Sequence, residues 1–184
     1  MSVISFRPLA RDDLPVLARW LAQPYVARWW REDADLAAVT ARYLPCLEGQ
    51  DPTELFVTEV DGSPAGFIQR YLIKDDPGGW ADVLAATGTP GVDAAFGMDY
   101  LIGDPALTGR GIGSAAIAEF TRLAFERYPE ADGALAAVAQ GNAASWRALE
   151  KAGFHRCWAG ELTSDDPSDQ GPMYLYRANR PPTL

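Results

Sequence analysis

Three glycines at alternate positions, Gly109, Gly111 and Gly113, connect a short apolar run to an amphipathic segment. The apolar run 96–102 predicts a strand, and the spacing of apolar residues in 111–127 predicts a helix. Because glycine tolerates left-handed backbone conformations, such a turn lets successive N–H groups converge on one point. The first N–H groups of the helix and its positive dipole end face the same way. The chain is therefore expected to form a strand-turn-helix unit whose turn could hold a phosphate or pyrophosphate.

The spacing of these glycines fits neither of the two most common nucleotide-binding motifs. The phosphate-loop pattern G-x-x-x-x-G-K-[ST] is absent, and residues 109–113 read G-x-G-x-G instead of the dinucleotide pattern G-x-G-x-x-G. The alternative is a plain strand-to-helix turn that binds no ligand. The turn alone leaves both explanations open.

One carboxylate, Asp99, lies within the apolar run that precedes the turn. Its neighbours Phe96, Leu101 and Ile102 indicate a mostly buried strand, where an unpaired carboxylate would be unfavourable. An aspartate that faces solvent from an edge strand is the alternative. We favour a functional carboxylate that acts beside whatever the glycine turn holds.

The composition is that of one folded domain spanning residues 1–184. Hydrophobic residues make up 48% of the chain, and it contains six Trp. The formal net charge of −9 argues against nucleic acid and anionic membranes as main partners. It suits a cationic substrate, although solubility alone can explain an acidic surface. No segment approaches membrane-spanning length and no basic leader is present, so we expect a cytoplasmic protein.

The cysteine and histidine content predicts no metal site. Cys46 and Cys157 are far apart and fit no metal or redox spacing, and His155 is the only histidine. We therefore expect reduced thiols and neither a His-based metal site nor a His-based catalytic triad.

Strands and amphipathic helices alternate along the rest of the chain. We expect strands at 3–7, 55–60, 65–73, 96–102, 134–139, 154–161 and 172–178, with a hairpin turn at 61–63. We expect helices from Asp12 or Asp13 to before Pro24, over 36–47 with strain or an end near Pro45, over 111–127, and from an Asn142 N-cap to Gly153. Residues 74–94 read as a long loop, and the aromatic segment 25–30 is left unassigned. The order of elements predicts a mixed α/β domain.

This order, the turn 108–113, and Asn142 followed by Glu-Lys-Ala-Gly-Phe at 150–154 resemble the GNAT superfamily of acyl-CoA-dependent N-acetyltransferases. The resemblance covers nearly the whole chain and implies a single GNAT-like domain with a central, mostly antiparallel mixed sheet flanked by helices. Segments 17–21, 26–30, 43–45, 79–80, 90–92 and 98–105 are similar to aminoglycoside 6′-N-acetyltransferases. The same group also resembles lysine N-acyltransferases of siderophore biosynthesis.

The resemblance implies acetyl-CoA as co-substrate and no metal. The pyrophosphate would lie on the glycine turn, and the pantetheine arm would extend the sheet along the strand that carries Leu101 and Ile102. The implied cofactor-binding residues are Leu101, Ile102, Thr108, Gly109, Arg110, Gly111, Ile112, Gly113, Ser114 and Asn142. Asp99 would face the reacting amine and take its proton, since an ammonium cannot attack a thioester. Direct attack forms no acyl-enzyme, so no nucleophilic side chain is required.

The acceptor is expected to be a cationic small-molecule amine, bound by a monomer or a homodimer. The candidate substrate-binding residues are Tyr25, Trp29, Trp30, Trp80, Asp82, Asp99 and Asp169. The alternatives are core packing for Trp29 and Trp30, which are not expected to be equally buried, and a surface lid without contacts for Trp80 and Asp82. A polar turn without function is the alternative for Asp169.

Two departures from the family keep other functions open. Leu149 stands where many members carry a Tyr beside the departing CoA thiolate, and the strand 134–139 lacks an aspartate that some aminoglycoside enzymes have. The first function is 6′-N-acetylation of an aminoglycoside. The alternatives are acylation of a lysine-like amine in a siderophore precursor and a CoA-binding domain without turnover.

Overall fold

A central mixed sheet organises the computed structural model, which describes residues 2–75, 80, 83, 87–88, 94–164 and 166–182. Within these residues seven strands follow the order β1-β2-β3-β4-β5-β7-β6. The strands are β1 (Ile4–Pro8), β2 (Glu54–Val60), β3 (Ser63–Leu72), β4 (Ala95–Ile102), β5 (Gly133–Ala139), β6 (His155–Leu162) and β7 (Gly171–Asn179). The helices are α1 (Leu14–Leu21), α2 (Pro24–Trp30), α3 (Leu36–Leu47), α5 (Ile112–Arg127) and α6 (Ala143–Lys151). The mixed α/β fold predicted from the sequence is thus confirmed.

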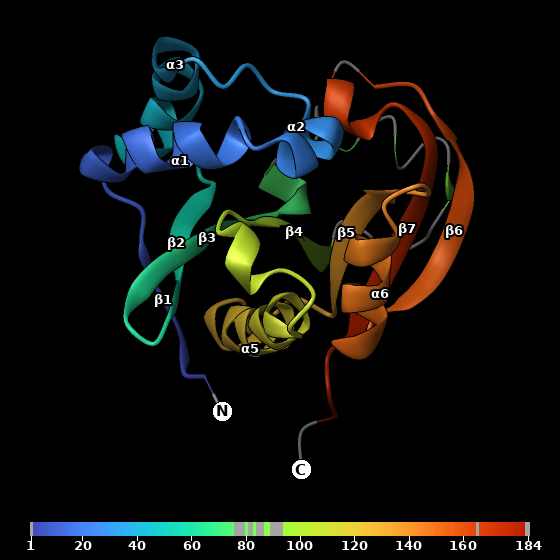
Figure 1. Cartoon of the computed structure of the whole chain (residues 1–184). Helices are drawn as coiled ribbons and strands as arrows, with labels where there is room; N and C mark the ends of the chain where they lie inside the picture. The colour runs from blue at the N-terminus through green and yellow to red at the C-terminus, as the bar shows by residue number, and fades with distance from the viewer. Residues whose placement is uncertain are drawn as a thin grey trace.

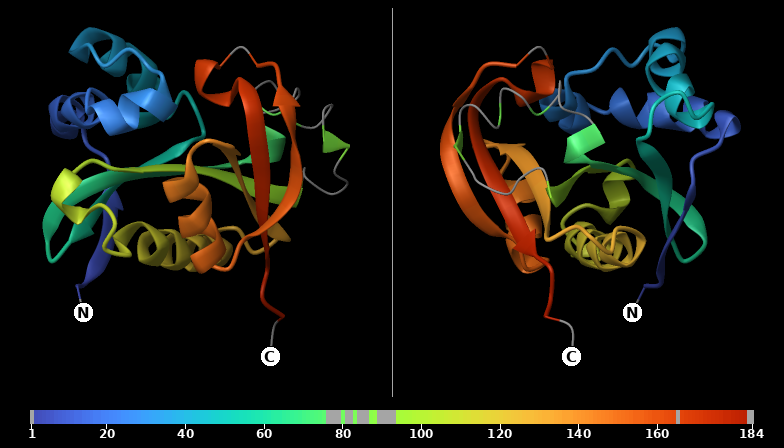
Figure 2. Two further views of the ribbon diagram at one scale, coloured as in Figure 1. Left: turned by 45° about the vertical axis from the view of Figure 1, so that its right-hand side comes forward. Right: turned by 180° about the vertical axis from the view of Figure 1, so that it is seen from behind.

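The helices cover the two faces of the sheet separately. In Figure 1, α1, α2 and α3 lie above the sheet and α5 lies below it, while Figure 2 shows the same layers from two further sides. Side chains of a strand alternate between faces, and β4 follows this rule. Phe96 and Met98 pack in one core cluster with Ile117 and Phe120 of α5, whereas Leu101 belongs to the cluster of α1. Asp99 lies at an odd position like Leu101 and therefore faces the side of α1 to α3.

The sheet separates at its centre, between β4 and β5. These two strands pair in parallel only where Ala95–Gly97 meets Gly133–Leu135. Beyond this short ladder β4 continues against β3 as far as Ile102, and β5 continues against β7 as far as Ala139. Because the two strands no longer pair with each other, their facing backbone edges are open to a ligand between them.

One local feature, the helix α2, differs from the sequence-based expectation. Residues 24–30 form a separate helix, α2, which the sequence analysis did not assign. Pro24 occupies its first turn, where a missing N–H is harmless, and Arg31 ends it in a left-handed conformation with φ 52°. The helix α3 spans Leu36–Leu47 as expected and ends soon after Pro45, where a proline removes few hydrogen bonds.

One other local expectation is confirmed. The predicted hairpin turn is present, with Asp61 and Gly62 both at positive φ. Of the expected long loop, residues 76–79, 81–82, 84–86 and 89–93 lie outside the described part of the chain. In the described part, no helix has the length and apolarity needed to span a bilayer, and no group of three or more His, Cys, Asp or Glu is placed to hold a metal ion.

Candidate functional site

A cavity of about 690 Å³ lies where β4 and β5 diverge. Residues 98–102 of β4 and 137–139 of β5 line it, together with α2, the glycine turn, the first turns of α5 and α6, and the turn 166–169. These elements lie on both faces of the sheet, so the cavity runs through the gap in the sheet. One end is bounded by the glycine turn, and the other by carboxylates.

Most of the predicted site residues line this one cavity. They are Tyr25, Trp29, Trp30, Asp99, Leu101, Ile102, Thr108, Gly109, Gly111, Gly113, Ser114, Asn142 and Asp169. Arg110 is exposed, and its guanidinium lies 3.5 Å from the Ala106 carbonyl oxygen. The Ile112 side chain packs with Val60 and Ala65, so only its backbone N–H can serve the predicted role. Asp82 lies outside the described residues.

The glycine turn has the geometry expected of an anion-binding turn. Gly109 and Gly111 have φ of 70° and 80°, and no atom lies within 4 Å of a Cβ added to either. Backbone conformation, not space, therefore requires glycine there. The backbone ladder of α5 starts with a bond from Ala115 N to Gly111 O. The N–H groups of residues 112–114 precede it and have no helical acceptor, which leaves them for a ligand.

The open edge of β4 connects the glycine turn with the rest of the cavity. Leu101 and Ile102 lie on this edge, and the Tyr25 hydroxyl donates a hydrogen bond of 2.8 Å to the Ile102 carbonyl oxygen. Across the gap, Asn142 caps α6, and its Oδ1 accepts a hydrogen bond from Ser145 N. A chain with alternating amide groups could add to the edge of β4 in the manner of an extra strand.

Asp99 is held by two donors from the neighbouring strand. Gln69 lies opposite Asp99 in the register of β3 and β4, and its Nε2 donates to Asp99 Oδ2 at 2.8 Å. Burial raises the pKa of Asp99, while the hydrogen bonds from Gln69 and from the Tyr71 hydroxyl lower it. Asp99 is therefore a better proton acceptor than a solvated aspartate, and its orientation is fixed.

Glycine at position 97 lets Tyr71 reach Asp99. Tyr71 pairs with Gly97 across the two strands, and a Cβ on Gly97 would lie 2.5 Å from the tyrosine ring. The ring can therefore lie flat over β4 only because position 97 has no side chain. The Trp80 Nε1 donates to the Tyr71 hydroxyl at 3.1 Å.

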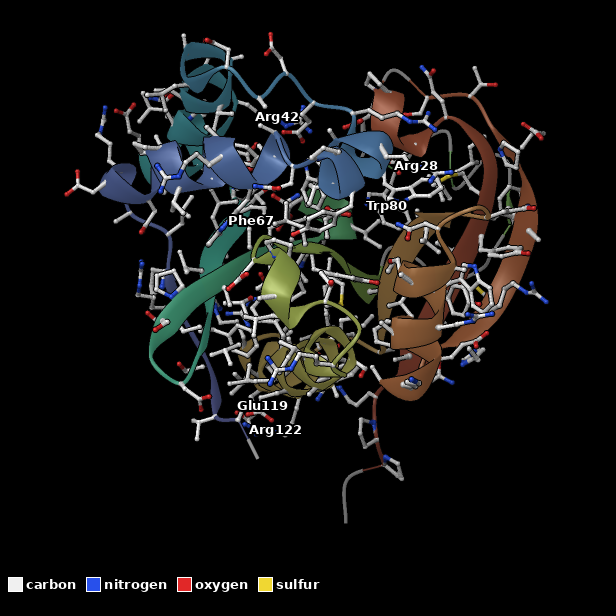
Figure 3. The ribbon with its side chains drawn as sticks, in the orientation of Figure 1. Arg28, Arg42, Phe67, Trp80, Glu119 and Arg122 are labelled. Carbon is white, nitrogen blue, oxygen red and sulfur yellow. The ribbon has the colours of Figure 1, made fainter. Side chains whose placement is uncertain are left out.

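Trp80 is buried in the core instead of lying on the surface. Only 5% of it is exposed, and it packs with Ile73, Val83 and Leu135. The surface-lid alternative is thus wrong for Trp80, and its contact with substrate stays a prediction. Figure 3 labels this side chain.

Trp29 and Trp30 contact different parts of the structure. Both are partly buried. Trp30 packs edge-to-face on Phe67, with ring centroids 6.0 Å apart. Trp29 approaches Gly141, where an added Cβ would lie 3.1 Å from its ring. The two rings therefore border the cavity from α2 on different sides.

Four carboxylates and one arginine form the other end of the cavity, which we call the acidic end: Glu32, Arg42, Asp99, Asp166 and Asp169. Burial, followed by the negative charges of Asp99 and Asp166, raises the pKa of Asp169 to about 7. Burial also raises the pKa of Glu32, against the opposing charge of Arg42. A cluster of this kind favours a ligand that brings positive charge.

A pair of hydroxyls lies near the position of the missing family tyrosine. Leu149 is fully buried in the core between the sheet, α5 and α6, and it contributes packing only. One turn earlier on α6, Ser145 lines the cavity, and its Oγ lies 2.7 Å from the Tyr100 hydroxyl. Both hydroxyl groups can donate a proton, whereas the aliphatic side chain of Leu149 cannot.

The sequence analysis missed Glu32, Arg42, Gln69, Tyr71 and Ser145. The alternation of β3 could have revealed Gln69 and Tyr71, because they share a face with Phe67. No sequence signal joins Glu32 and Arg42 to Asp166, which comes more than a hundred residues later.

Comparisons with known proteins agree with this geometry. The chain is 29% identical over 166 residues to the aminoglycoside N(6′)-acetyltransferases type 1 of Klebsiella pneumoniae and Serratia marcescens, covering 89% of this chain and 78% of each relative. It is also similar to the structure of the aminoglycoside acetyltransferase AAC(6′)-Ib in complex with coenzyme A and kanamycin. The TM-score is 0.81 at 25% identity, over 97% of this chain and 95% of the other. The acetyltransferase (GNAT) domain family matches residues 10–162. The chain therefore belongs to the acetyltransferase (GNAT) domain family and is an acetyl-CoA-dependent N-acetyltransferase.

Proposed function

We propose that this chain transfers the acetyl group of acetyl-CoA to the 6′-amine of an aminoglycoside. The observation that carries the proposal is the cavity itself, because it joins an anion-binding turn at one end to a carboxylate cluster at the other. A polyanionic cofactor and a polycationic acceptor would enter from opposite ends. Their reactive groups would then meet in the gap between β4 and β5, beside Asp99.

In this proposal the acetyl-CoA pyrophosphate is bound by backbone N–H groups. The N–H groups of residues 109–114 would hold it at the positive end of α5, and Ser114 Oγ donates to Gly111 O at 2.9 Å, which keeps the turn in place. The pantetheine arm then follows β4 past Leu101 and Ile102. The Tyr25 hydroxyl already bonds to Ile102 O, so it would have to share or yield this acceptor.

At the acidic end the amine must lose a proton before it can attack. Asp99 is the proposed acceptor of that proton, directly or through water. The free amine nitrogen bonds to the thioester carbonyl carbon, and the C–S bond then breaks with its electron pair on sulfur. The nitrogen loses a second proton as the amide forms. The CoA thiolate takes up one proton and leaves as the free thiol.

The remaining acidic residues would hold the other ammonium groups of the acceptor. Asp169 has a raised pKa because its neighbours are carboxylates, and an arriving ammonium would relieve that repulsion. Trp29 and Trp30 would supply apolar surface for sugar rings. A cytoplasmic location, where acetyl-CoA is available, and a monomer or homodimer remain predictions.

The test is CoA release with neomycin and paromomycin as a matched pair of acceptors. Paromomycin carries a hydroxyl where neomycin carries the 6′-amine, so only neomycin should be turned over at that position. Mass spectrometry with fragmentation of the product then locates the acetyl group. Acetylation of both compounds would move the reaction to another amine.

Two further outcomes would replace the proposed function. Turnover of a lysine-like amine with long-chain acyl-CoA, but not of aminoglycosides, would favour the siderophore-type reaction. Tight acetyl-CoA binding with no turnover of any amine tested would favour a binding domain.

A further inference from the structure

Arg42 reaches into the acidic end and binds two of its carboxylates. Its Nε lies 2.8 Å from Glu32 Oε1 and its Nη2 lies 3.1 Å from Asp166 Oδ2. Glu32 lies between α2 and α3, and Asp166 precedes the short turn 167–169 near the other end of the chain. All three side chains line the cavity. Figure 3 labels Arg42 on the side of the sheet covered by α1 to α3.

These ion pairs are only partly screened by solvent. The Glu32 side chain is 8% exposed and that of Asp166 is 33% exposed, whereas Arg42 is 48% exposed. The Tyr43 hydroxyl also donates to Glu32 Oε2 at 2.9 Å, so Glu32 has partners on both carboxylate oxygens. A carboxylate engaged in this way is not free to bind an ammonium group of a ligand.

Anchoring of the turn 166–169 does not depend on Arg42 alone. The Arg31 Nη1 donates to the Pro167 carbonyl oxygen at 3.0 Å, and the Ser168 hydroxyl donates to the Trp30 carbonyl oxygen. These two bonds tie the turn to α2 without neutralising a carboxylate. The distinctive effect of Arg42 is thus its charge.

We propose that Arg42 is a specificity-determining residue that acts as a built-in cation at the acidic end. It occupies Glu32 and Asp166, which an additional ammonium group of the acceptor would otherwise bind, and so limits the positive charge that the site accepts. The inference rests on the proposed function, because it concerns the same acceptor. It predicts that removing the arginine charge shifts preference toward acceptors with one more amine.

Kanamycin A and kanamycin B provide the matched test. They differ by one group, a 2′-hydroxyl in kanamycin A and a 2′-amine in kanamycin B, on the ring that carries the 6′-amine. For Arg42→Gln we expect the ratio of kcat/KM for kanamycin B over kanamycin A to rise about fivefold over that of the unsubstituted chain. An unchanged ratio in a folded, active Arg42→Gln chain overturns the proposal.

Three further variants separate charge from anchoring. Arg42→Lys retains the charge and should retain the ratio. Ser168→Ala loses the hydroxyl bond to the Trp30 carbonyl oxygen without a change of charge and should also retain the ratio, so an equal shift in this variant would make Arg42 an anchor and overturn the proposal. Asp166→Asn removes a carboxylate that Arg42 already occupies and keeps the oxygen that accepts from Ser168 N, so this variant should leave the ratio unchanged.

Calorimetric binding distinguishes failure of this inference from failure of the proposed function. The dissociation constants of both compounds are measured without acetyl-CoA for each variant. If the unsubstituted chain binds both but acetylates neither, the proposed reaction fails while the ratio of dissociation constants still tests Arg42. If Arg42→Gln does not fold, Asp166→Asn decides: an unchanged ratio supports the proposal, and a lower ratio, which would show that Asp166 already binds the extra ammonium, overturns it.

Discussion

The two ends of the cavity are built in different ways. The glycine turn belongs to one continuous segment and presents backbone N–H groups, whose partial charge does not change with pH. The acidic end combines side chains from β4, the α2–α3 connection, α3 and the turn 166–169. Its charge depends on how these side chains shift one another's pKa, as the raised pKa of Asp169 illustrates. The turn is therefore suited to holding a constant group, and the acidic end to selecting and deprotonating a variable one.

Substitution of Asp99 should have the largest effect and should separate the two ends. In Asp99→Asn the bond to Gln69 can persist, but the proton acceptor is lost, so we expect turnover to fall about a hundredfold or more. Acetyl-CoA affinity, measured by calorimetry, should stay nearly unchanged, because the proposed binding site of that cofactor is at the other end. Asp12→Asn, on an exposed residue outside the cavity, is the control. Retained turnover in Asp99→Asn would place the proton acceptor elsewhere.

Substitution of Gly111 should act at the opposite end. Alanine in a backbone conformation with φ 80° is strained by about 1–2 kcal/mol, so the turn should distort and acetyl-CoA affinity should fall about tenfold. Acceptor affinity should not change. Gly49→Ala has the same kind of strain, with φ 72°, and lies outside the cavity. If both variants weaken acetyl-CoA binding equally, loss of stability and not turn geometry is the cause.

Asp169 should make stability depend on pH. Its pKa is raised to about 7 from an unfolded value near 3.8, so between these values the folded chain holds a proton that the unfolded chain has lost. This contribution to stability is fully present below the unfolded pKa and is lost as pH rises through the folded one. Relative to Asp169→Asn, the unsubstituted chain should lose about 3 kcal/mol of unfolding free energy between pH 4 and pH 7.

Urea denaturation of both chains across this pH range measures that difference. A constant difference would show that Asp169 titrates as an ordinary surface carboxylate. The same series with acceptor present tests the link to binding, because an acceptor ammonium should favour the ionised form and reduce the slope.

Removal of the Tyr71 hydroxyl should give the smallest effect. Tyr71→Phe keeps the ring over Gly97 but removes a hydrogen bond that lowers the pKa of Asp99. The pKa of Asp99 should therefore rise. Because Asp99 must be ionised to accept a proton, the rise of kcat/KM with pH should move upward by about half a pH unit. Tyr174→Phe, on β7, is the control. Stability must be measured alongside, since the buried Trp80 indole N–H loses its acceptor. An unmoved pH profile would leave Tyr71 as a packing residue.

The elements that depend only on residues close together in the sequence were predicted well. The strand, glycine turn and helix over 96–127 required only neighbouring residues, and so did the Asn142 cap. The helix α2 was missed because Pro24 was interpreted only as the end of α1, although proline is equally suited to a first helical turn. Trp80 was expected in a loop because its segment has little periodicity, and its burial follows from packing against β3 and the β5–β7 region.

By itself the sequence determined the glycine turn at one end of the cavity, because adjacent residues form it and the spacing of Gly109, Gly111 and Gly113 can be read directly from the sequence. It also identified Asp99 as unusual, since a carboxylate stood in an apolar strand. Only the tertiary structure decided what surrounds Asp99. Strand register placed Gln69 and Tyr71 beside it, and packing of distant segments brought Glu32, Arg42 and Asp166 together. The physical reason is that interactions between side chains depend on distance in space, which for these residues bears no relation to distance along the chain.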